Sequence, residues 1–396
     1  MTEYRFAAAE DYKNLIEMAN HAFDPKHWTG DFEKDTSPES FFPRILPKLY
    51  QNIKTAPMHY IAVQDGKVVG VVGNFELPTM VAGEKLYVIG IGTVSTHPDH
   101  RGEGHMIRLM DDSVARAKSF GADYMVLGGD RQRYEHWGFE TAGLNPEFVF
   151  DEHAFRHLYG KDADFGYRFV PLSEELKEEL ALAKKLRTSE QTYVLHEPDQ
   201  EYNIYFSMGA KPYFIMKDGA CTGSLMSFEG GKTIGDLRTM NPSETGKILN
   251  DYRKVFAALE LRVSRVAPDE EEMLAILSRI SGESTISGCE MIRVLNYERT
   301  IRAFLRMKCV VNAVPDCEIS AAFDNGERLR IGVQDGEAFV EKLPETAPAD
   351  VSFKRPEEAV NYFFGHMRFI TDFGLGELPQ APFLPLPYYQ PACDEI

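Results

Sequence analysis

The spacing of apolar residues changes along the first part of the chain, and this change constrains the fold more than any other feature. In three segments about every second residue is apolar, and turn pairs such as Asp65-Gly66 separate them, which predicts consecutive antiparallel strands. These segments are 59–64, 68–77 and 86–98. After Pro98 the apolar residues recur at helical spacing until Gly121, a residue type that commonly follows a helix end. The pattern predicts a strand meander that leads into a helix.

The flanking segments complete one α/β unit. An amphipathic helix is expected over 10–23, before the strands. A buried strand is expected at 123–129, then a short polar helix around 131–137 and a last strand through Phe139 and Phe148. Because strands and helices alternate, we expect an α/β domain over residues 1–149.

A second unit repeats this order of elements without detectable sequence identity. After a charged helical stretch at 173–186, a hairpin is expected around Asp218-Gly219. A strand at 232–240, a helix at 242–256 and a strand and helix within 259–280 follow. The repeated order predicts an internal structural duplication, with the second domain at residues 150–290.

The third unit, residues 291–396, is expected to contain a strand and helix at 291–308, strands within 318–343 and a helix at 356–369. Residues 377–396 are rich in proline and aromatic residues, so they suit neither a helix nor a central strand. They are either a disordered tail or an extended segment that docks on another domain. Five apolar residues favour docking: Phe383, Leu384, Leu386, Tyr388 and Tyr389.

Composition narrows the classes of partner. A chain of 396 residues exceeds the usual size of one domain, and its net charge of -18 disfavours nucleic acid and membrane surfaces but suits a cationic ligand. The five cysteines have no C-x-x-C spacing, so we expect free thiols in a cytoplasmic protein. No run of 18 apolar residues and no amino-terminal export signal is present, so neither a membrane span nor secretion is expected.

Residues 90–110 carry the clearest chemical signal. A strand leads into a loop with Gly102 and Gly104, and the loop leads directly into a helix, whose first backbone N–H groups are free to bind an anion. Arg101 adds a guanidinium that suits phosphate oxygens. The pattern predicts a phosphate site, and the alternative is an ordinary glycine turn before a helix.

This stretch resembles the acyl-CoA-binding motif of the GNAT acetyltransferases, Arg/Gln-x-x-Gly-x-Gly/Ala at a helix start. Arg101 and Gly104 match it, His97-Pro98 often precedes it, and Met106 stands where glycine or alanine is usual. Downstream, residues 134–139 resemble the family's Tyr-x-x-x-Gly-Phe segment. The resemblance implies acetyl-CoA as co-substrate, with binding residues Val94, Ser95, Thr96, Arg101, Gly102, Glu103, Gly104, His105 and Met106.

The whole chain resembles the enhanced intracellular survival (Eis) acetyltransferases, which have two GNAT-like domains and a sterol-carrier-like third domain. In that family the carboxylate of the last residue, here Ile396, reaches the active site. Such proteins often form trimers or hexamers, although the sequence does not fix the oligomeric state. The second unit has Met240-Asn241-Pro242 where a glycine loop would be needed, so we expect it to bind no CoA. The third unit is expected to position the carboxy terminus, while a lipid cavity is the less favoured alternative.

The resemblance implies direct transfer of acetyl to an amine through a tetrahedral oxyanion. Tyr134 would be the general acid, and a backbone N–H near Val94 would polarise the carbonyl. A phenol, with an ordinary pKa of about 10, is a weaker acid than a thiol at about 8.5, so the site must stabilise phenolate. The Ile396 carboxylate would orient the amine and relay its proton through water. The alternative for Tyr134 is a packed aromatic side chain.

The acceptor is expected to be a cationic amine, such as an aminoglycoside, a polyamine or a lysine-like group. Acidic residues alternate with aromatic residues after the first helix and would suit such a cation, although a solvated acidic loop is an equally good interpretation. These residues are Asp24, Trp28, Asp31, Phe32, Glu33 and Asp35. Alternatives to the acetyltransferase are a non-catalytic acyl-CoA-binding sensor or scaffold and an enzyme for longer acyl chains.

Two other groups of residues are given no chemical role. His97, His100 and His105 lie close in sequence, but they lie on the expected phosphate loop and lack a known zinc spacing, so no metal is expected. Cys393 has no basic neighbour and is expected to be an unreactive thiol.

Overall fold

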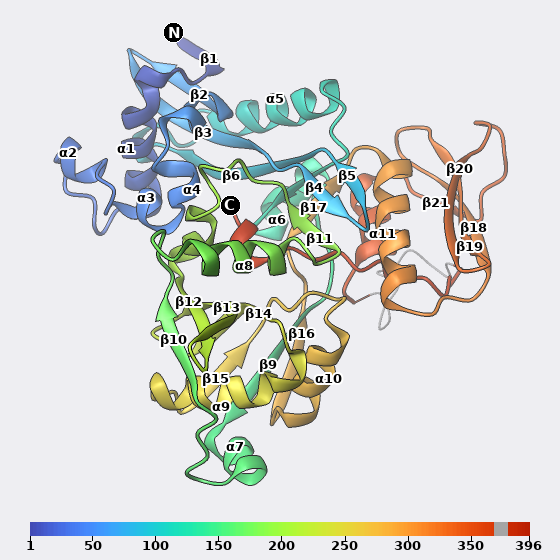
Figure 1. The fold of residues 1–396 in the computed structure, drawn as a ribbon. Helices are drawn as coiled ribbons and strands as arrows, with labels where there is room; N and C mark the ends of the chain where they lie inside the picture. Colours follow the sequence, from blue (N-terminus) through green and yellow to red (C-terminus); the bar gives the residue numbers. More distant parts are fainter. Residues whose placement is uncertain (368–378) are drawn as a thin grey trace.

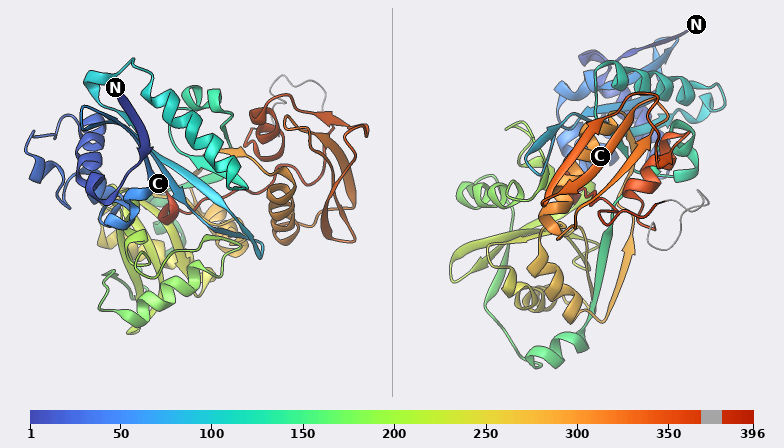
Figure 2. Two further views of the ribbon diagram at one scale, coloured as in Figure 1. Left: turned by 90° about the horizontal axis from the view of Figure 1, so that it is seen from above. Right: turned by 90° about the vertical axis from the view of Figure 1, so that its right-hand side faces the viewer.

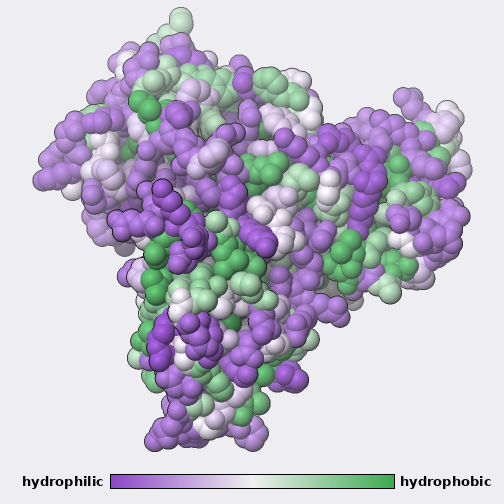
Figure 3. Space-filling view, viewed as in Figure 1, coloured by the Kyte–Doolittle hydropathy of each residue, from purple (hydrophilic) through white to green (hydrophobic). Residues whose placement is uncertain are grey.

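The computed structural model describes residues 1–367 and 379–396 as three units around four β-sheets (Figure 1). The first and second units each contain a seven-stranded sheet, and the third projects to one side, as Figure 1 and the left view of Figure 2 show. The α/β fold class expected from the sequence is confirmed. No helix in the described ranges combines the length and apolar character needed to cross a bilayer. Hydrophilic residues cover most of the face in Figure 3, as the large net charge leads one to expect.

The first sheet has its helices on both faces. α1 (Tyr12–Phe23) and α5 (His105–Ser119) pack on the central strands. Val71 belongs to the apolar cluster that includes α1, whereas Val72 belongs to the cluster that includes α5, so adjacent residues of one strand serve opposite faces. The strand order is β1 (Thr2–Phe6), β2 (His59–Gln64), β3 (Lys67–Glu76), β6 (Val88–Thr96), β7 (Tyr124–Leu127), β17 (Met291–Val294) and β8 (Glu140–Thr141).

The second sheet repeats the first strand for strand, which confirms the predicted duplication. In both sheets the fourth and fifth strands are parallel, and all other neighbours are antiparallel. The order is β10 (Tyr167–Pro171), β12 (Lys211–Lys217), β13 (Ala220–Phe228), β14 (Thr233–Thr239), β15 (Glu260–Val263), β9 (Asn145–Asp151) and β16 (Glu283–Ser287). Its helices are α7 (Glu152–Tyr159), α8 (Lys177–Arg187), α9 (Thr245–Val255) and α10 (Glu271–Ile280).

Each of the two large sheets contains one strand that the sequence analysis assigned to another unit. The strand through Phe148, assigned from the sequence to the first unit, is β9 and pairs with β15 and β16 of the second sheet. The strand that begins at Met291, assigned to the third unit, is β17 and lies between β7 and β8 of the first sheet. The sequence predicts one strand through Phe139 and Phe148, but the structure divides this stretch into β8, which stays in the first sheet, and β9. Local patterns do not encode this break or the edge that each strand joins, because pairing depends on long-range packing.

The third unit packs one long helix, α11 (Tyr297–Val311), on strand β20 of a four-stranded sheet. Its second helix, α12 (Pro356–Phe364), ends earlier than the expected 369, and residues 368 and 369 lie outside the described residues. The sheet order is β20 (Glu337–Lys342), β19 (Arg328–Gln334), β18 (Cys317–Ala322) and β21 (Val351–Ser352). A small sheet, β11 (Thr192–Val194), β4 (Thr79–Val81) and β5 (Glu84–Leu86), joins the first two units.

Short helices connect these elements and line parts of the site. In the first unit they are η1 (Ala9–Asp11), α2 (Phe32–Asp35), α3 (Phe41–Ile45), α4 (Pro47–Tyr50), η2 (Ile53–Met58), η3 (Pro98–His100), α6 (Arg131–Tyr134) and η4 (Glu135–Trp137). Later in the chain they are η5 (Asn203–Gly209), η6 (Pro242–Glu244) and η7 (Ala392–Asp394).

The carboxy-terminal segment, residues 379–396 and here called the strap, runs buried between the units to the C label of Figure 1. Of the five residues that favoured docking, four are buried and Leu384 is partly buried. The expected segment began at 377, and residues 377 and 378 lie outside the described part. Cys393 is fully buried, and burial raises the pKa of its thiol well above the ordinary value, as suits an unreactive group.

Side chains from the first two units hold the end of the strap. The Asp236 carboxylate accepts hydrogen bonds from the backbone N–H groups of Ala392 (2.8 Å) and Cys393 (2.9 Å). Lys48 Nζ (2.7 Å) and Ser207 Oγ (3.0 Å) donate to the Cys393 carbonyl oxygen. These contacts fix where the last residues of the chain lie.

Candidate active site

The site begins where strands β6 and β7 part. The two strands pair only from Val88 to Gly90 on β6, and no other strand of the described ranges pairs with this edge of β6 beyond Gly90. A β-bulge lies at this point, with Thr93 at φ 54°, a left-handed conformation that is costly for a β-branched residue. The Thr93 hydroxyl is hydrogen-bonded to the buried Tyr50 hydroxyl, which helps to fix the bulge. Unpaired backbone groups of β6 therefore face an open wedge.

A cavity of 650 Å³ continues from this wedge along the start of α5. Gly102 (φ 85°) and Gly104 (φ 82°) adopt left-handed conformations that turn the chain into the helix at His105. A side-chain Cβ at either glycine would meet no atom within 4 Å, so the loop leaves open space beside the helix N-terminus. This arrangement fits a diphosphate, because helix N-termini bind anions through free N–H groups.

All expected acetyl-CoA-binding residues except Glu103 line this cavity. Met106, the α5 residue that departs from the family pattern, is partly buried against the apolar core. It borders the cavity without closing it. Glu103 instead turns toward two histidines. Sequence reasoning missed Phe23 and Arg133, which also line the cavity and come from the end of α1 and from α6.

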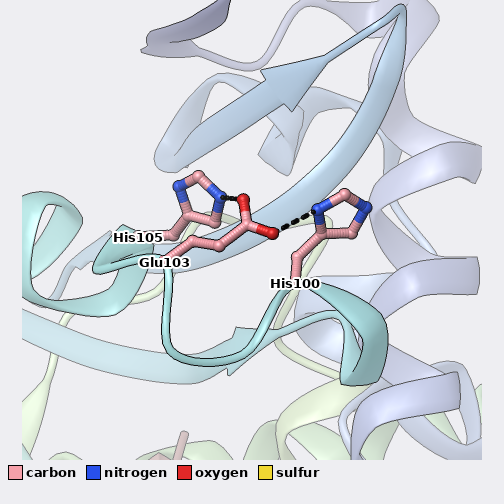
Figure 4. Close-up of side chains that lie close together, drawn as sticks. All are labelled: His100, Glu103 and His105. Atoms are coloured by element: carbon pink, nitrogen blue, oxygen red, sulfur yellow. Dashed lines mark hydrogen bonds and ion pairs between the residues drawn. The ribbon is translucent and has the colours of Figure 1, made fainter.

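Glu103 bridges His100 and His105 in the loop (Figure 4). Its Oε1 lies 3.2 Å from His100 Nδ1, and its Oε2 lies 3.1 Å from His105 Nε2. The other ring nitrogen of His105 lies 2.9 Å from the Tyr4 hydroxyl. Histidine and glutamate are residue types that bind metals, and these three side chains lie close enough together to do so. The hydrogen bonds among them already account for their arrangement and order the loop.

A second cavity, of 440 Å³, meets the first at Phe23, Val94 and Arg133. Both strands of the wedge contribute to it, through residues 91–94 of β6 and 126–129 at the end of β7. Apolar side chains of α1 and α3, including Phe41 and Phe42, form another wall. The two cavities therefore adjoin past the bulge of β6.

Tyr134 lies in the second cavity at the end of α6. The Asp130 side chain caps this short helix by accepting from the Gln132 N–H at 3.1 Å. The Tyr134 side chain is buried, and burial raises the pKa of its phenol, an effect that Arg133 partly opposes. Tyr134 therefore remains protonated near neutral pH and holds a proton to donate. The net rise of its pKa runs against the phenolate stabilisation expected from the sequence, which, among the described residues, only Arg133 provides.

Ile396 lines the same cavity as Tyr134. The side chain of Ile396 occupies the space beside Gly90, where an added Cβ would lie 2.3 Å from Ile396 Cδ1. Its carboxyl carbon would lie 3.7 Å from a Cβ at Gly92, so the last carboxyl group lies against β6 just before the bulge.

The acidic loop after α1 does not line this cavity. Asp24, Trp28 and Asp35 border a separate hollow of 390 Å³, and none of the loop's four acids is among the described residues around the 440 Å³ cavity. The Asp35 carboxylate accepts the backbone N–H groups of Thr29 and Gly30, at 3.0 and 2.8 Å. The acids that the sequence offered as a cation site therefore lie outside the cavity that holds Tyr134, and Asp35 is used to order its own loop.

The acids that do line the cavity are Asp130, Glu290 and Glu395. Glu290 lies just before β17, and Glu395 is the penultimate residue. Arg265, from the loop after β15, is hydrogen-bonded to both glutamates. No sequence motif marks these residues, since they come from three distant segments.

Comparisons with known proteins agree with this geometry. Residues 3–142 match the family model described as acetyltransferase (GNAT) domain. No curated protein sequence matches the chain significantly.

Three solved structures share the fold over most of their length. A GCN5-related N-acetyltransferase from Anabaena variabilis is 14% identical with a TM-score of 0.61, covering 91% of this chain and 89% of that one. A probable N-acyltransferase from Enterococcus faecalis is 13% identical (TM-score 0.59; 87% and 86% covered). Eis1 from Mycobacterium abscessus is also 13% identical (TM-score 0.59; 89% and 86% covered). Residues 3–142 thus form a GNAT domain, and the chain is an acetyltransferase that uses acetyl-CoA.

Proposed function

We propose that the enzyme transfers the acetyl group to the amine of a cationic small molecule or lysine-like group. The observation that supports this most is the pair of adjoining cavities: one lies along the phosphate loop, and the other, which it meets at Val94, holds Tyr134 and acidic side chains. The 440 Å³ cavity has apolar walls and the carboxyl groups of Glu290 and Glu395, a combination that suits an alkyl ammonium.

In the proposed reaction each residue has a defined role. The loop from Arg101 to Met106 binds the diphosphate, and the free edge of β6 holds the adjoining arm of acetyl-CoA. A backbone N–H near Val94 stabilises the negative charge that develops on the carbonyl oxygen. Tyr134 donates its proton to the departing thiolate, and the Ile396 carboxylate orients the amine.

We propose that the second unit binds no CoA and instead anchors the strap. Asp236 on β14 occupies the position of Thr93 on β6, in an equivalent bulge with φ 49°. Ala392 lies against this place, 3.4 Å from a Cβ added at Gly235. The strap therefore lies where β14 parts from β15, as the acetyl-CoA arm is proposed to lie in the first unit.

The third unit is proposed to be a sterol-carrier-like domain that guides the strap rather than a lipid site. The Leu386 N–H donates to the Phe363 carbonyl oxygen of α12 at 2.7 Å. Helix α12 in turn packs on β17 and β8 of the first sheet. We propose domains at 1–149, 150–290 and 291–396; β9, which begins in the first domain, joins the second sheet, and β17 of the third domain joins the first sheet. We also propose an Eis-like oligomer and a cytoplasmic location.

The function is tested by mixing the protein with acetyl-CoA, a thiol reagent and a panel of polyamines, aminoglycosides and lysine peptides. Amine-dependent release of CoA thiol supports the proposal. No release with any amine would favour a non-catalytic acyl-CoA-binding protein, and faster turnover with longer acyl-CoAs would favour another acyl donor.

Arg101→Ala is expected to weaken acetyl-CoA binding by about 10- to 10²-fold, because a charge-assisted contact to a phosphate contributes about 1.5–3 kcal/mol. Calorimetry measures the Kd. Arg108→Ala is the matched control, since Arg108 lies on α5, the helix that follows the loop of Arg101, but pairs with Asp112 at 2.7 Å. Equal Kd values for the two variants would remove Arg101 from the binding site.

A further inference from the structure

Three charged side chains from distant segments meet at the 440 Å³ cavity. Arg265 Nη2 lies 3.2 Å from Glu290 Oε1 and is also hydrogen-bonded to Glu395 Oε1. The side chains of Arg265, Glu290 and Glu395 are only 15%, 16% and 19% exposed. Both glutamates border the cavity that holds Tyr134, so their remaining exposure is toward the place where an acceptor would bind.

Arg265 is held in a conformation that few non-glycine residues adopt. Its φ is 55°, which costs of order 1–3 kcal/mol unless surrounding contacts compensate. Its N–H donates to Asn145 Oδ1 at 3.2 Å, and its carbonyl oxygen accepts from the Tyr389 hydroxyl at 2.9 Å. Its Nη1 also donates to the Gln390 carbonyl oxygen at 3.3 Å. Backbone strain that surrounding contacts maintain beside a cavity is typical of a residue with a functional role.

One guanidinium faces two carboxylates, so the cluster carries one uncompensated negative charge when both glutamates are ionised. Burial raises the pKa of Glu395 to about 7; Arg265 opposes the shift and Glu290 adds to it. Burial also raises the pKa of Glu290, again opposed by Arg265. Asp236 from β14 and Lys48 from α4 act on Glu395 in opposite directions. The Cys289 thiol and the phenols of Tyr388 and Tyr389 also lie beside the cluster, and the Ile396 carboxylate follows Glu395 in the chain.

We propose that Glu290 and Glu395, held together by Arg265, form a proton-accepting pair that takes the proton from the acceptor ammonium. This inference rests on the proposed transfer to a cationic amine. It assigns the proton to a side-chain pair rather than to the Ile396 carboxylate, and it gives the second unit, through Arg265, a direct part in the active site.

The proton balance is complete within the site. One proton passes from the ammonium to the glutamate pair, which leaves a neutral amine. The carbon–nitrogen bond then forms and the carbon–sulfur bond breaks, while Tyr134 protonates the thiolate. The nitrogen releases its second proton, which restores the Tyr134 phenol, and the pair returns its proton to solvent after product release.

The pair is tested by steady-state kinetics of Glu395→Gln with two acceptors. Spermidine is protonated at neutral pH, whereas 4-methoxyaniline is not and needs no base before attack. We expect kcat/KM for spermidine to fall about 10²-fold and that for 4-methoxyaniline to stay within about threefold. Equal losses for both acceptors, or no loss for spermidine, would overturn the proposal.

The pH dependence supplies a second readout that does not depend on the arylamine. The wild-type kcat/KM for spermidine should fall as pH drops below about 7, because the pair becomes protonated. Glu290→Gln removes a like charge beside Glu395, so this acid limb should move to lower pH by about one pH unit. An unmoved limb would contradict the pairing.

A control variant and a binding measurement distinguish a loss of the proton-accepting pair from a loss of folding or of the whole activity. Glu260→Gln removes a carboxylate that pairs with Arg262 at 2.8 Å on the surface, and it should behave as wild type. Acetyl-CoA affinity by calorimetry should match wild type in every variant, which shows that each one folds. A wild-type protein that acetylates no amine would overturn the proposed function and this inference together. An active wild type with an unaltered Glu395→Gln variant would overturn this inference alone.

Discussion

Replacing Tyr134 by phenylalanine is expected to lower kcat by about 10²-fold and to leave the Kd for acetyl-CoA almost unchanged. The change removes one oxygen atom from a buried ring and therefore removes the proposed proton donor without creating a large cavity. Because the proton is needed only as the thiolate departs, kcat and kcat/KM should fall together. Thiol release under saturating acetyl-CoA measures the rate, and calorimetry measures the Kd.

Tyr60→Phe is the matched control for this variant. The Tyr60 side chain comes from β2 of the first sheet, and its hydroxyl donates to Asp112 at 3.0 Å, outside both cavities. Removing it should cost stability but not turnover. A Tyr134→Phe enzyme with wild-type kcat would show that Tyr134 is only a packed aromatic side chain.

The sequence predicts those strands, helices and turns whose apolar spacing and turn residues are local. The alternation at 59–64 and 68–77 became β2 and β3, and the glycine loop before His105 became the turn into α5. Such features depend on neighbours within a few residues, where side-chain direction and backbone conformation are set. The repeated order of elements was likewise enough to predict that the second sheet resembles the first.

Strand partners and the acceptor wall could not be predicted in the same way. β9 and β17 look like ordinary strands of their own units, and nothing local distinguishes the edge that each one joins. The acids after α1 looked like a cation site, yet Asp35 orders its own turn. The sequence does not identify Arg265 or Glu290 as site residues, because a single charged residue in a loop is usually solvated. Only tertiary packing brings these two side chains together.

Asp236 is another residue that only the fold explains, since a buried aspartate within a strand is costly unless it is bonded. Its carboxylate binds two strap N–H groups and lies 3.3 Å from Arg238 Nη1. Asp236→Asn retains the shape and tolerates the left-handed backbone, but its amide group cannot accept both N–H groups. We expect the local free energy that holds the strap to fall by about 3 kcal/mol, within the range for breaking a buried ionic contact.

That loss should appear as faster hydrogen exchange at the end of the chain. A change of about 3 kcal/mol corresponds to about 10²-fold faster exchange of the Ala392 and Cys393 amides, measurable by mass spectrometry of a carboxy-terminal peptide. Turnover should fall as well, because Glu395 and Ile396 would leave the cavity, whereas acetyl-CoA should still bind.

Asp164→Asn provides the comparison for the Asp236 variant. Asp164 also accepts a backbone N–H, that of Gly166 at 2.7 Å, and pairs with Arg168, but its side chain is 58% exposed. Water replaces such contacts, so this variant should change neither exchange in the strap nor turnover. If Asp236→Asn released the strap and yet left turnover intact, the last residues would have no part in catalysis, and the proton would have to leave the amine by another route.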